Sequence, residues 1–244
     1  METGENNPII QIVDKSFNND FLSQYHLSIE LSKKTLSYCI IDTKKLRCHL
    51  LHSVNYNNQE DLSNLLSNDM YITKEFYSKS ISLSNFPNTL VPTELYNEND
   101  NNKIFELNHG KAEVILIDDL NDYQIKNIYS IPESLNQTIN NLIPNINIKS
   151  QTTILIDYIL SKNYNTEKLT LYIKDNYVNI LITYNNQLIF QNKFKFSTKE
   201  DLLFYSLFCI QEMNLSPEKI DTEIYGNISK SEFQILYEYI RNIK

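Results

Sequence analysis

The feature that most constrains the fold of this chain is an internal repeat of its apolar pattern. Residues 27–48 and residues 169–190 align without a gap, and their apolar positions coincide. The matched pairs are Leu27 with Leu169, Ile29 with Leu171, Leu31 with Ile173, Leu36 with Val178, Tyr38 with Ile180, Ile40 with Ile182, Leu46 with Leu188 and Cys48 with Phe190. Each series alternates with a period of two, which is typical of strands with one buried face. A repeat of this kind predicts two similar halves.

Both copies continue with a candidate helix and then a further candidate strand. We expect the helices at 57–66 and 197–208, and the strands at 80–85 and 222–227. Each helix opens with a capping-box pattern, which satisfies free amide groups of the first turn. The paired residues are Asn57 with Glu60 and Ser197 with Glu200. The repeating unit is therefore β-β-β-α-β, and the common order favours a duplication.

The segment between the two copies is assigned to the first half. The two prolines in 86–97 predict irregular structure, and His109-Gly110 predicts a hairpin turn between strands. Strands are then expected at 126–132 and 145–150, and helices at 133–143, 153–162 and 229–243. The predicted organisation is a polar N-terminal segment (1–20), a first subdomain (21–165) with an inserted region near 86–130, and a shorter second subdomain (166–244).

The composition limits the classes of function. Of 244 residues, 41% are hydrophobic, which is enough for a packed core, and the net charge is −8. An acidic chain lacks the clustered lysines and arginines with which proteins bind nucleic acid. The three cysteines are expected as core thiols without a disulfide. The polar start, METGENNP, and the lack of long apolar runs predict a cytoplasmic protein with no membrane segment.

Two halves that each open β-β-β-α-β resemble the duplicated ribonuclease H-like fold of the actin superfamily. The chain is identified as a member of DUF3822, an uncharacterised bacterial family that is similar to the actin-like ATPases FtsA and PilM. The resemblance spans about residues 20–244 and rests on the paired meanders and on FPNTLVPTELY, NIYSIPESL and TEIYGNIS. It implies an α/β fold of the actin-like ATPase class. None of these stretches is a catalytic motif, so the resemblance concerns the fold.

The resemblance also indicates where a nucleotide would bind. Actin-like ATPases hold phosphates on a glycine-containing turn between the first two strands of each half, where the backbone must approach the phosphate closely. The matching positions here are Ser32, Lys33 and Thr35 in the first half and Asp175 and Asn176 in the second, none of them glycine. Of the Gly-Gly pair that packs on adenosine, one member remains as Gly226, preceded by Tyr225, which would stack on a purine or lie in the core.

We therefore interpret six residues as remnants of a nucleotide cleft: Ser32, Lys33, Thr35, Asp175, Asn176 and Gly226. We expect no cofactor, no catalytic residue and no metal, and a protein that acts by association with an unknown protein partner, a second copy of the chain being one candidate. The alternative is a nucleotide-binding ATPase or ATP-dependent switch of the actin, FtsA or PilM type, holding ATP with Mg²⁺. Losing phosphate-binding donors typically costs orders of magnitude in rate, which favours the first hypothesis.

Two other chemistries are disfavoured by the sequence. A ribonuclease H-like nuclease needs several carboxylates around two metal ions. The candidates are Glu30, Asp42, Asp118 and Asp119, of which Asp42 and Asp118 fall at strand ends and are expected to be solvated. A zinc site is disfavoured because His49 and His52 would point to opposite faces of a strand.

Overall fold

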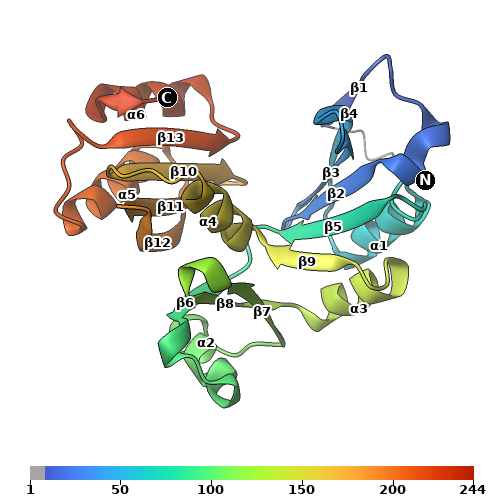
Figure 1. The fold of residues 1–244 in the computed structure, drawn as a ribbon, viewed down its shortest axis with the longest axis horizontal. Coiled ribbons are helices and arrows are strands. Elements are labelled where there is room, and N and C mark those ends of the chain that lie inside the picture. The colour runs from blue at the N-terminus through green and yellow to red at the C-terminus, as the bar shows by residue number, and fades with distance from the viewer. Residues whose placement is uncertain (1–8) are drawn as a thin grey trace. The chain divides into compact units, whose positions relative to one another are not determined.

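The computed structural model describes residues 9–244 and has a mixed α/β architecture (Figure 1). It divides into two compact units, Met1–Ile154 and Leu155–Lys244, and the boundary falls inside the helix α4 (Gln151–Ser161). The subdomain boundary expected at residue 165 falls in the loop that follows this helix. Residues 1–8 of the expected polar segment lie outside the described residues.

The first unit is built on a six-stranded sheet of order β1-β4-β3-β2-β5-β9. Its strands are β1 (Ile10–Val13), β2 (His26–Leu31), β3 (Thr35–Asp42), β4 (Arg47–Asn55), β5 (Ser78–Leu83) and β9 (Asn147–Ser150), and the 3-10 helix η1 (Asn19–Gln24) follows β1. β2, β3 and β4 form the predicted antiparallel meander. β5 pairs parallel to β2, and β9 parallel to β5. The strand β1 lies in a segment for which the sequence predicted none.

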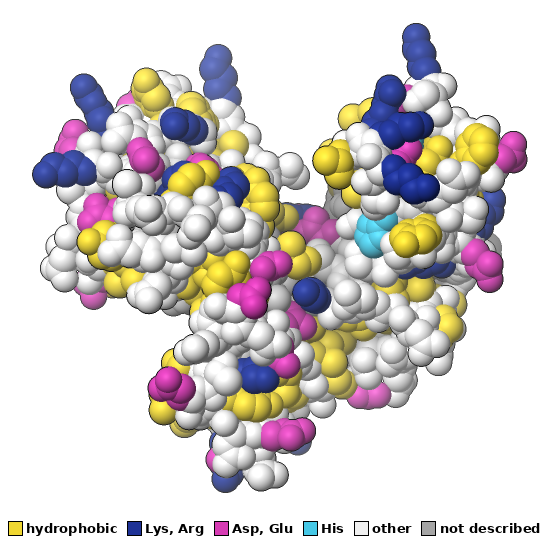
Figure 2. Space-filling model, in the orientation of Figure 1, with side chains coloured by type: hydrophobic (Ala, Val, Ile, Leu, Met, Phe, Trp, Pro, Cys, Tyr) yellow, Lys and Arg dark blue, Asp and Glu magenta, His cyan; other side chains and the backbone are white. Residues whose placement is uncertain are grey.

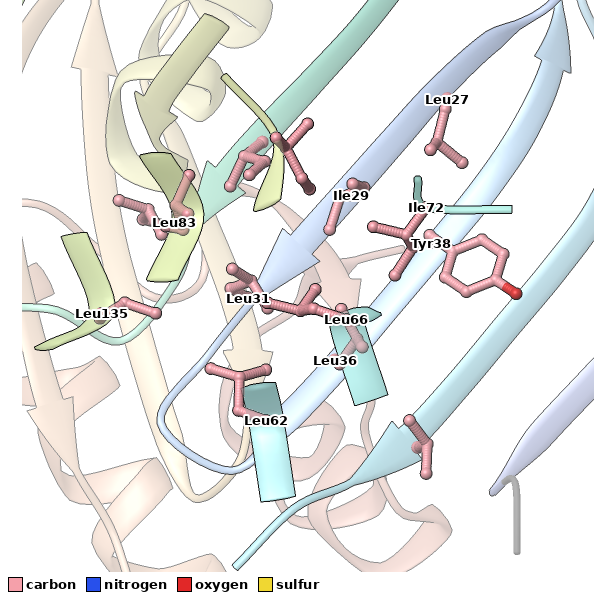
Figure 3. Close-up of a cluster of buried hydrophobic side chains, with 14 of the residues drawn as sticks. Leu27, Ile29, Leu31, Leu36, Tyr38, Leu62, Leu66, Ile72, Leu83 and Leu135 are labelled. Carbon is pink, nitrogen blue, oxygen red and sulfur yellow. The ribbon is translucent and has the colours of Figure 1, made fainter. Parts of the chain in front are cut away.

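Two helices of the first unit, α1 (Gln59–Asn68) and α3 (Glu133–Leu142), pack side by side. Their apolar faces and one face of the sheet enclose a common core. Figure 3 shows Leu62 and Leu66 of α1 pointing toward Leu31 and Leu36 of the sheet. The predicted alternation is thus confirmed for β2, where every second side chain is buried in this core.

Between β5 and α3 the chain forms a separate three-stranded antiparallel sheet of order β6-β8-β7. Its elements are β6 (Asn88–Pro92), β7 (Val114–Leu120), β8 (Ile125–Ile131) and α2 (Asn101–His109), with the 3-10 helices η2 (Thr93–Leu95), η3 (Glu98–Asp100) and η4 (Asn121–Tyr123). The hairpin predicted at His109-Gly110 is wrong. Residues 101–109 form a helix that buries Phe105, and Gly110, with φ 76°, caps its end by donating its amide to Glu106.

The second unit repeats the order of the first. Its five-stranded sheet has the order β12-β11-β10-β13-β14, in which β10, β11 and β12 form an antiparallel meander and β13 runs parallel to β10. The elements are β10 (Lys168–Lys174), β11 (Tyr177–Tyr184), β12 (Gln187–Lys195), α5 (Lys199–Glu212), β13 (Asp221–Gly226), α6 (Lys230–Tyr239) and β14 (Asn242–Ile243). A second core lies between this sheet and the two helices. Both units therefore contain the predicted β-β-β-α-β series, which β1 precedes in the first unit.

The starts of α1 and α5 lie one residue later than the sequence predicted. Asn58 caps α1 by accepting the amide of Asp61, and Thr198 forms a capping box with Asp201. In both places two neighbouring residues can serve as the cap, and an aspartate at the third helical position fixes which one does. The element type is right and the boundary is wrong by one residue.

The surface of the described chain agrees with its composition. Lys, Arg, Asp and Glu side chains are interspersed over the face that Figure 2 shows.

Of the cysteines, Cys209 is buried as expected, whereas Cys39 is half-buried and Cys48 is exposed, so the prediction of a core thiol is wrong for Cys48. Among the helices of residues 9–244, none combines the length and apolar character that a membrane crossing requires.

Candidate functional site

The turn between β2 and β3 contains three of the predicted nucleotide-site residues, Ser32, Lys33 and Thr35. Ser32 and Thr35 are buried, and Lys33 is exposed. Tyr56 stabilises the turn through two hydrogen bonds. Its amide donates to the Lys34 carbonyl at 2.9 Å, and its hydroxyl donates to the Ser32 carbonyl. Its backbone is therefore held in place by the strand β4 and the residue that follows it.

Ser32 also uses the amide groups of the turn. Its hydroxyl oxygen accepts from the Thr35 amide at 3.0 Å and from the Lys34 amide at 3.3 Å, while its own amide donates to the Thr35 carbonyl at 3.0 Å. A phosphate-binding loop points its amide groups at the ligand. In this turn the amides of Ser32, Lys34 and Thr35 already have acceptors inside the loop.

The corresponding turn of the second unit contains Asp175 and Asn176. Their φ values, 51° and 63°, are both positive, as a two-residue type I′ hairpin turn requires. The turn is closed by pairing of Lys174 with Tyr177, and the Asn176 carbonyl accepts the Phe196 amide at 2.9 Å. These contacts are those of an ordinary hairpin between β10 and β11.

Gly226 lies close to this hairpin, at the end of β13 beside Ile173 of β10. Its φ is 89°, and a Cβ atom at this position would overlap the carbonyl group of Ile173. The amide of the next residue, Asn227, donates to that same carbonyl at 2.8 Å. The packing of two neighbouring strands therefore accounts for the glycine without a nucleotide. The structure brings Asp175, Asn176 and Gly226 together in the second unit and Ser32, Lys33 and Thr35 together in the first.

Tyr225 is half-buried and lies outside the apolar core of the second unit. Its hydroxyl donates to Glu223 at 2.6 Å and lies 2.8 Å from Lys162 Nζ. Glu223 accepts a further bond from Lys168 at 2.7 Å. Burial alone would raise the pKa of Glu223, but hydrogen bonds from Lys168, Tyr225 and Lys162 outweigh it and lower the pKa to about 2. We call these four hydrogen-bonded side chains, Glu223, Tyr225, Lys162 and Lys168, the Glu223 cluster.

A pocket of about 340 Å³ lies beside the β2–β3 turn within the first unit. Segments far apart in the sequence line it: Lys33, residues 56–59 at the start of α1, residues 86–87 before β6, Lys111 and Glu113 before β7, and residues 130–132 with Leu135 at the start of α3. Its apolar wall comes from buried side chains, Phe86, Ile131 and Leu135. The pocket lies where the insertion meets the six-stranded sheet and its helices.

The polar groups of this pocket are distributed unevenly. Lys33 and Lys111 are exposed, and among residues 9–244 neither forms an ion pair. Glu113 is engaged, because its carboxylate accepts the Glu133 amide at 3.0 Å and so caps α3, whose own cap residue, Pro132, has no side-chain hydrogen bond. The start of α1 is capped by Asn58. Two ammonium groups thus line a pocket that has both polar side chains and an apolar wall.

The carboxylates of the nuclease alternative are used structurally. Asp118 is 7% exposed, not solvated as expected, and accepts from Tyr129, Ser150 and Thr153. Burial raises its pKa, although these hydrogen bonds oppose the shift. Asp42 is likewise buried and accepts the amides of Lys44 and Lys45, which closes the β3–β4 turn.

No metal centre is evident in the described part of the chain. No group of three or more His, Cys, Asp or Glu side chains within residues 9–244 is arranged to hold a metal ion. His49, one of the residues weighed for zinc, is buried and packs against the rings of Phe17 and Tyr25.

The sequence interpretation found the β2–β3 turn but missed the pocket beside it. Of the pocket residues only Lys33 was predicted as a site residue. The other segments have no common motif, and tertiary packing alone brings them together. The nearest sequence signal was the pair of predicted helix starts at residues 57 and 133, since helix starts present amide groups.

Comparison with known proteins identifies a family and similar folds for most of the chain. The family model described as "Protein of unknown function (DUF3822)" matches residues 14–243. A Bacteroides thetaiotaomicron protein with an actin-like ATPase fold and unknown function is similar over 93% of both chains, with TM-score 0.84 and 23% identity. PilM–PilN, a type IV pilus biogenesis complex, is similar over 89% of this chain and 87% of the other, with TM-score 0.57 and 13% identity. Among curated proteins, none matches.

Proposed function

The chain belongs to the DUF3822 family and has the actin-like ATPase fold, and from this premise we propose that it acts by binding another protein and does not hydrolyse ATP. The family and the fold confirm the resemblance predicted from the sequence. At identities below 25% the structural similarity concerns the fold alone, so the proposed activity rests on the residues of this chain.

One observation supports the loss of ATP chemistry above all others: the β2–β3 turn bonds its own amides. Ser32 Oγ accepts the amides of Lys34 and Thr35, so these donors are not presented to a phosphate. A nucleotide would have to break both bonds before it could form its own. Preorganised donors are the main source of rate acceleration in such sites. A turn whose donors point inward therefore favours a degenerate nucleotide site.

Exposed aromatic side chains of the second unit support association with a protein. Phe204 and Phe208 stack on α5 with ring centroids 5.9 Å apart, and Phe233 and Tyr237 stack on α6 at 6.0 Å. Phe204 and Tyr237 are 61% and 60% exposed. Large exposed apolar side chains that gather in this way are typical of interaction surfaces. PilM is also described in a complex with another protein, PilN.

The proposal is tested first with nucleotide. The full chain is heated with and without millimolar MgATP, and its melting temperature is recorded. A ligand at 100 times its Kd would add about 2.7 kcal/mol of stability, which is a shift of several degrees. We expect no shift. A clear shift would instead support the nucleotide-dependent switch.

A second experiment concerns association. The wild-type chain and the double variant Phe204→Ser/Phe208→Ser are used as baits in extracts of the native cell, with quantitative comparison of the proteins retained. We expect at least one protein to be retained by the wild type and lost from the variant. The matched control is Leu95→Ser/Leu107→Ser, which removes two exposed leucines of the first unit that do not form a stacked pair. Equal retention by both variants would contradict a role for the α5 pair.

A further inference from the structure

We propose that the pocket beside Lys33 is a docking site for an acidic peptide segment of the partner protein. One aliphatic side chain of the segment lies on the apolar wall, and a neighbouring carboxylate lies between Lys33 and Lys111. This inference rests on the proposed function, because it names the chemistry of the partner that the chain binds.

The shape of the pocket fits part of a peptide. Its volume of about 340 Å³ is at the lower end of the range for ligand sites, roughly 300–1,000 Å³. Phe86, Ile131 and Leu135 form its wall, while Lys33 and Asn57 at its edge are exposed. An extended peptide can place one side chain in such a pocket and leave the next in solvent, because successive side chains of a strand point to opposite faces.

The charge of the pocket selects an acidic segment. Lys33 and Lys111 have no ion-pair partner among residues 9–244, and the one carboxylate of the lining, Glu113, accepts the amide of Glu133. Counted over the lining residues alone, two lysines against one glutamate, the charge is positive, while the adjoining first turns of α1 and α3 carry Glu60, Asp61 and Glu133. Carboxylates beside ammonium groups are favourable, and like charges at an interface are costly. A basic segment is therefore disfavoured at this site.

Two helix starts also line the pocket. Residues 57–59 at the start of α1 and Pro132 at the start of α3 belong to the lining. The start of a helix has a partial positive charge from its free amide groups. The carboxylate of Glu113 already occupies one such position, at α3, which shows that a carboxylate fits the geometry here. The first turns already carry carboxylates, Glu60 and Asp61 on α1 and Glu133 on α3, so the preference for an acidic segment rests on the two lysines.

The test uses a display library of random dodecapeptides, with the full chain as the immobilised protein. Selection is performed on the wild type and on Lys33→Ala/Lys111→Ala. The matched control is Lys34→Ala, which removes an exposed lysine from the same turn that does not line the pocket. All these side chains are exposed, so the variants are expected to fold, and equal melting temperatures verify this.

We expect the wild type to enrich peptides in which Asp or Glu lies within two positions of Leu, Ile or Val. A synthetic copy of the best peptide should bind the double lysine variant about tenfold more weakly, and should bind Lys34→Ala as it binds the wild type. Its binding to the wild type should also weaken as the salt concentration rises.

Three outcomes would overturn the inference: no enrichment, enrichment of neutral or basic peptides, or equal binding by the wild type and the double variant. They are separate from the nucleotide experiment. A shift with MgATP contradicts the proposed function whatever the library shows, and a failed selection without such a shift removes only the acidic docking site.

Discussion

Gly226 lies so close to Ile173 that its position leaves no room for a side chain. The two residues are partners in the parallel pair β10–β13, and a Cβ atom on Gly226 would overlap the Ile173 carbonyl. The same carbonyl accepts the amide of Asn227. A glycine that resembles half of a nucleotide motif is thus required by the sheet itself.

The first prediction follows from this contact. Gly226→Ala should destabilise the protein by about 1–3 kcal/mol for the positive φ and by about 1–3 kcal/mol more for the overlap. The control is Gly110→Ala, where φ is 76° but nothing lies within 4 Å of the added Cβ, so only the first contribution applies. Urea unfolding of both variants measures the difference. Equal losses would contradict the close approach.

The second prediction concerns the hydroxyl of Tyr56. Tyr56→Phe removes the hydrogen bond to the Ser32 carbonyl and should cost about 1–2 kcal/mol of unfolding free energy. Hydrogen exchange should also become faster at the amides of Lys34 and Thr35, because the turn loses one of its supports. Tyr77→Phe, at a tyrosine that is 74% exposed, should change stability by less than about 0.5 kcal/mol. Similar effects from both variants would argue against a held turn.

The third prediction is a pH dependence from the Glu223 cluster. Because the pKa of Glu223 is lowered from 4.5 to about 2, the folded state binds its proton less readily than the unfolded state. Its contribution to stability is therefore complete above pH 4.5 and is lost as the pH falls toward 2.

Glu223→Gln should thus lower the free energy of unfolding by about 1–2 kcal/mol at pH 7, with a smaller difference near pH 2. Denaturation curves of the wild type and the variant across this range measure the effect. Glu218→Gln, at an exposed carboxylate outside the cluster, should leave the pH profile unchanged. A difference between wild type and Glu223→Gln that stays constant down to pH 2 would show that the carboxylate charge is not responsible.

The fourth prediction concerns Asp118, which ties β7 to the start of α4. Its Oδ1 accepts from Tyr129 at 3.1 Å, and its Oδ2 accepts from the Ser150 amide and Thr153 Oγ1, both at 2.7 Å. In Asp118→Asn an amide group would face a donor, so we expect a loss of about 2–3 kcal/mol. Asp119→Asn is the control, since the Asp119 side chain is 48% exposed in its pair with Lys126. Thermal unfolding of the two variants tests the expectation.

The sequence predicted the sheets well because their cause is local. Alternation in residues 27–31 places every second side chain in a core, and this pattern needs no knowledge of the partner strand. In residues 169–173 the three apolar side chains also lie in a core, but Thr170 between them is buried as well. The hairpin at His109-Gly110 was wrong because a positive-φ glycine serves equally as a turn residue and as a helix cap. The burial of Phe105 decides between the two, and that burial depends on tertiary packing.

The candidate site was only partly predictable for the same reason. The turn residues Ser32 and Asp175 follow from the positions of the strands, but whether turn amides point outward depends on which side chain bonds them. In sequence, the hydroxyl of Ser32 suggested a phosphate loop. In the structure this hydroxyl accepts hydrogen bonds from the amides of the same loop. The pocket could not be predicted, since its lysines, Lys33 and Lys111, come from segments far apart in the sequence.

The closed turn also affects the entropy of binding at Lys33. Its backbone neighbours on either side, Ser32 and Lys34, both form hydrogen bonds within the turn, which restrict the backbone at Lys33. A partner that contacts it does not have to order a loop, and the loss of conformational entropy is limited to about 0.5–1.5 kcal/mol for one long side chain. In the proposed docking site, the internal hydrogen bonds of the turn would therefore hold the backbone of Lys33 ready for a protein partner.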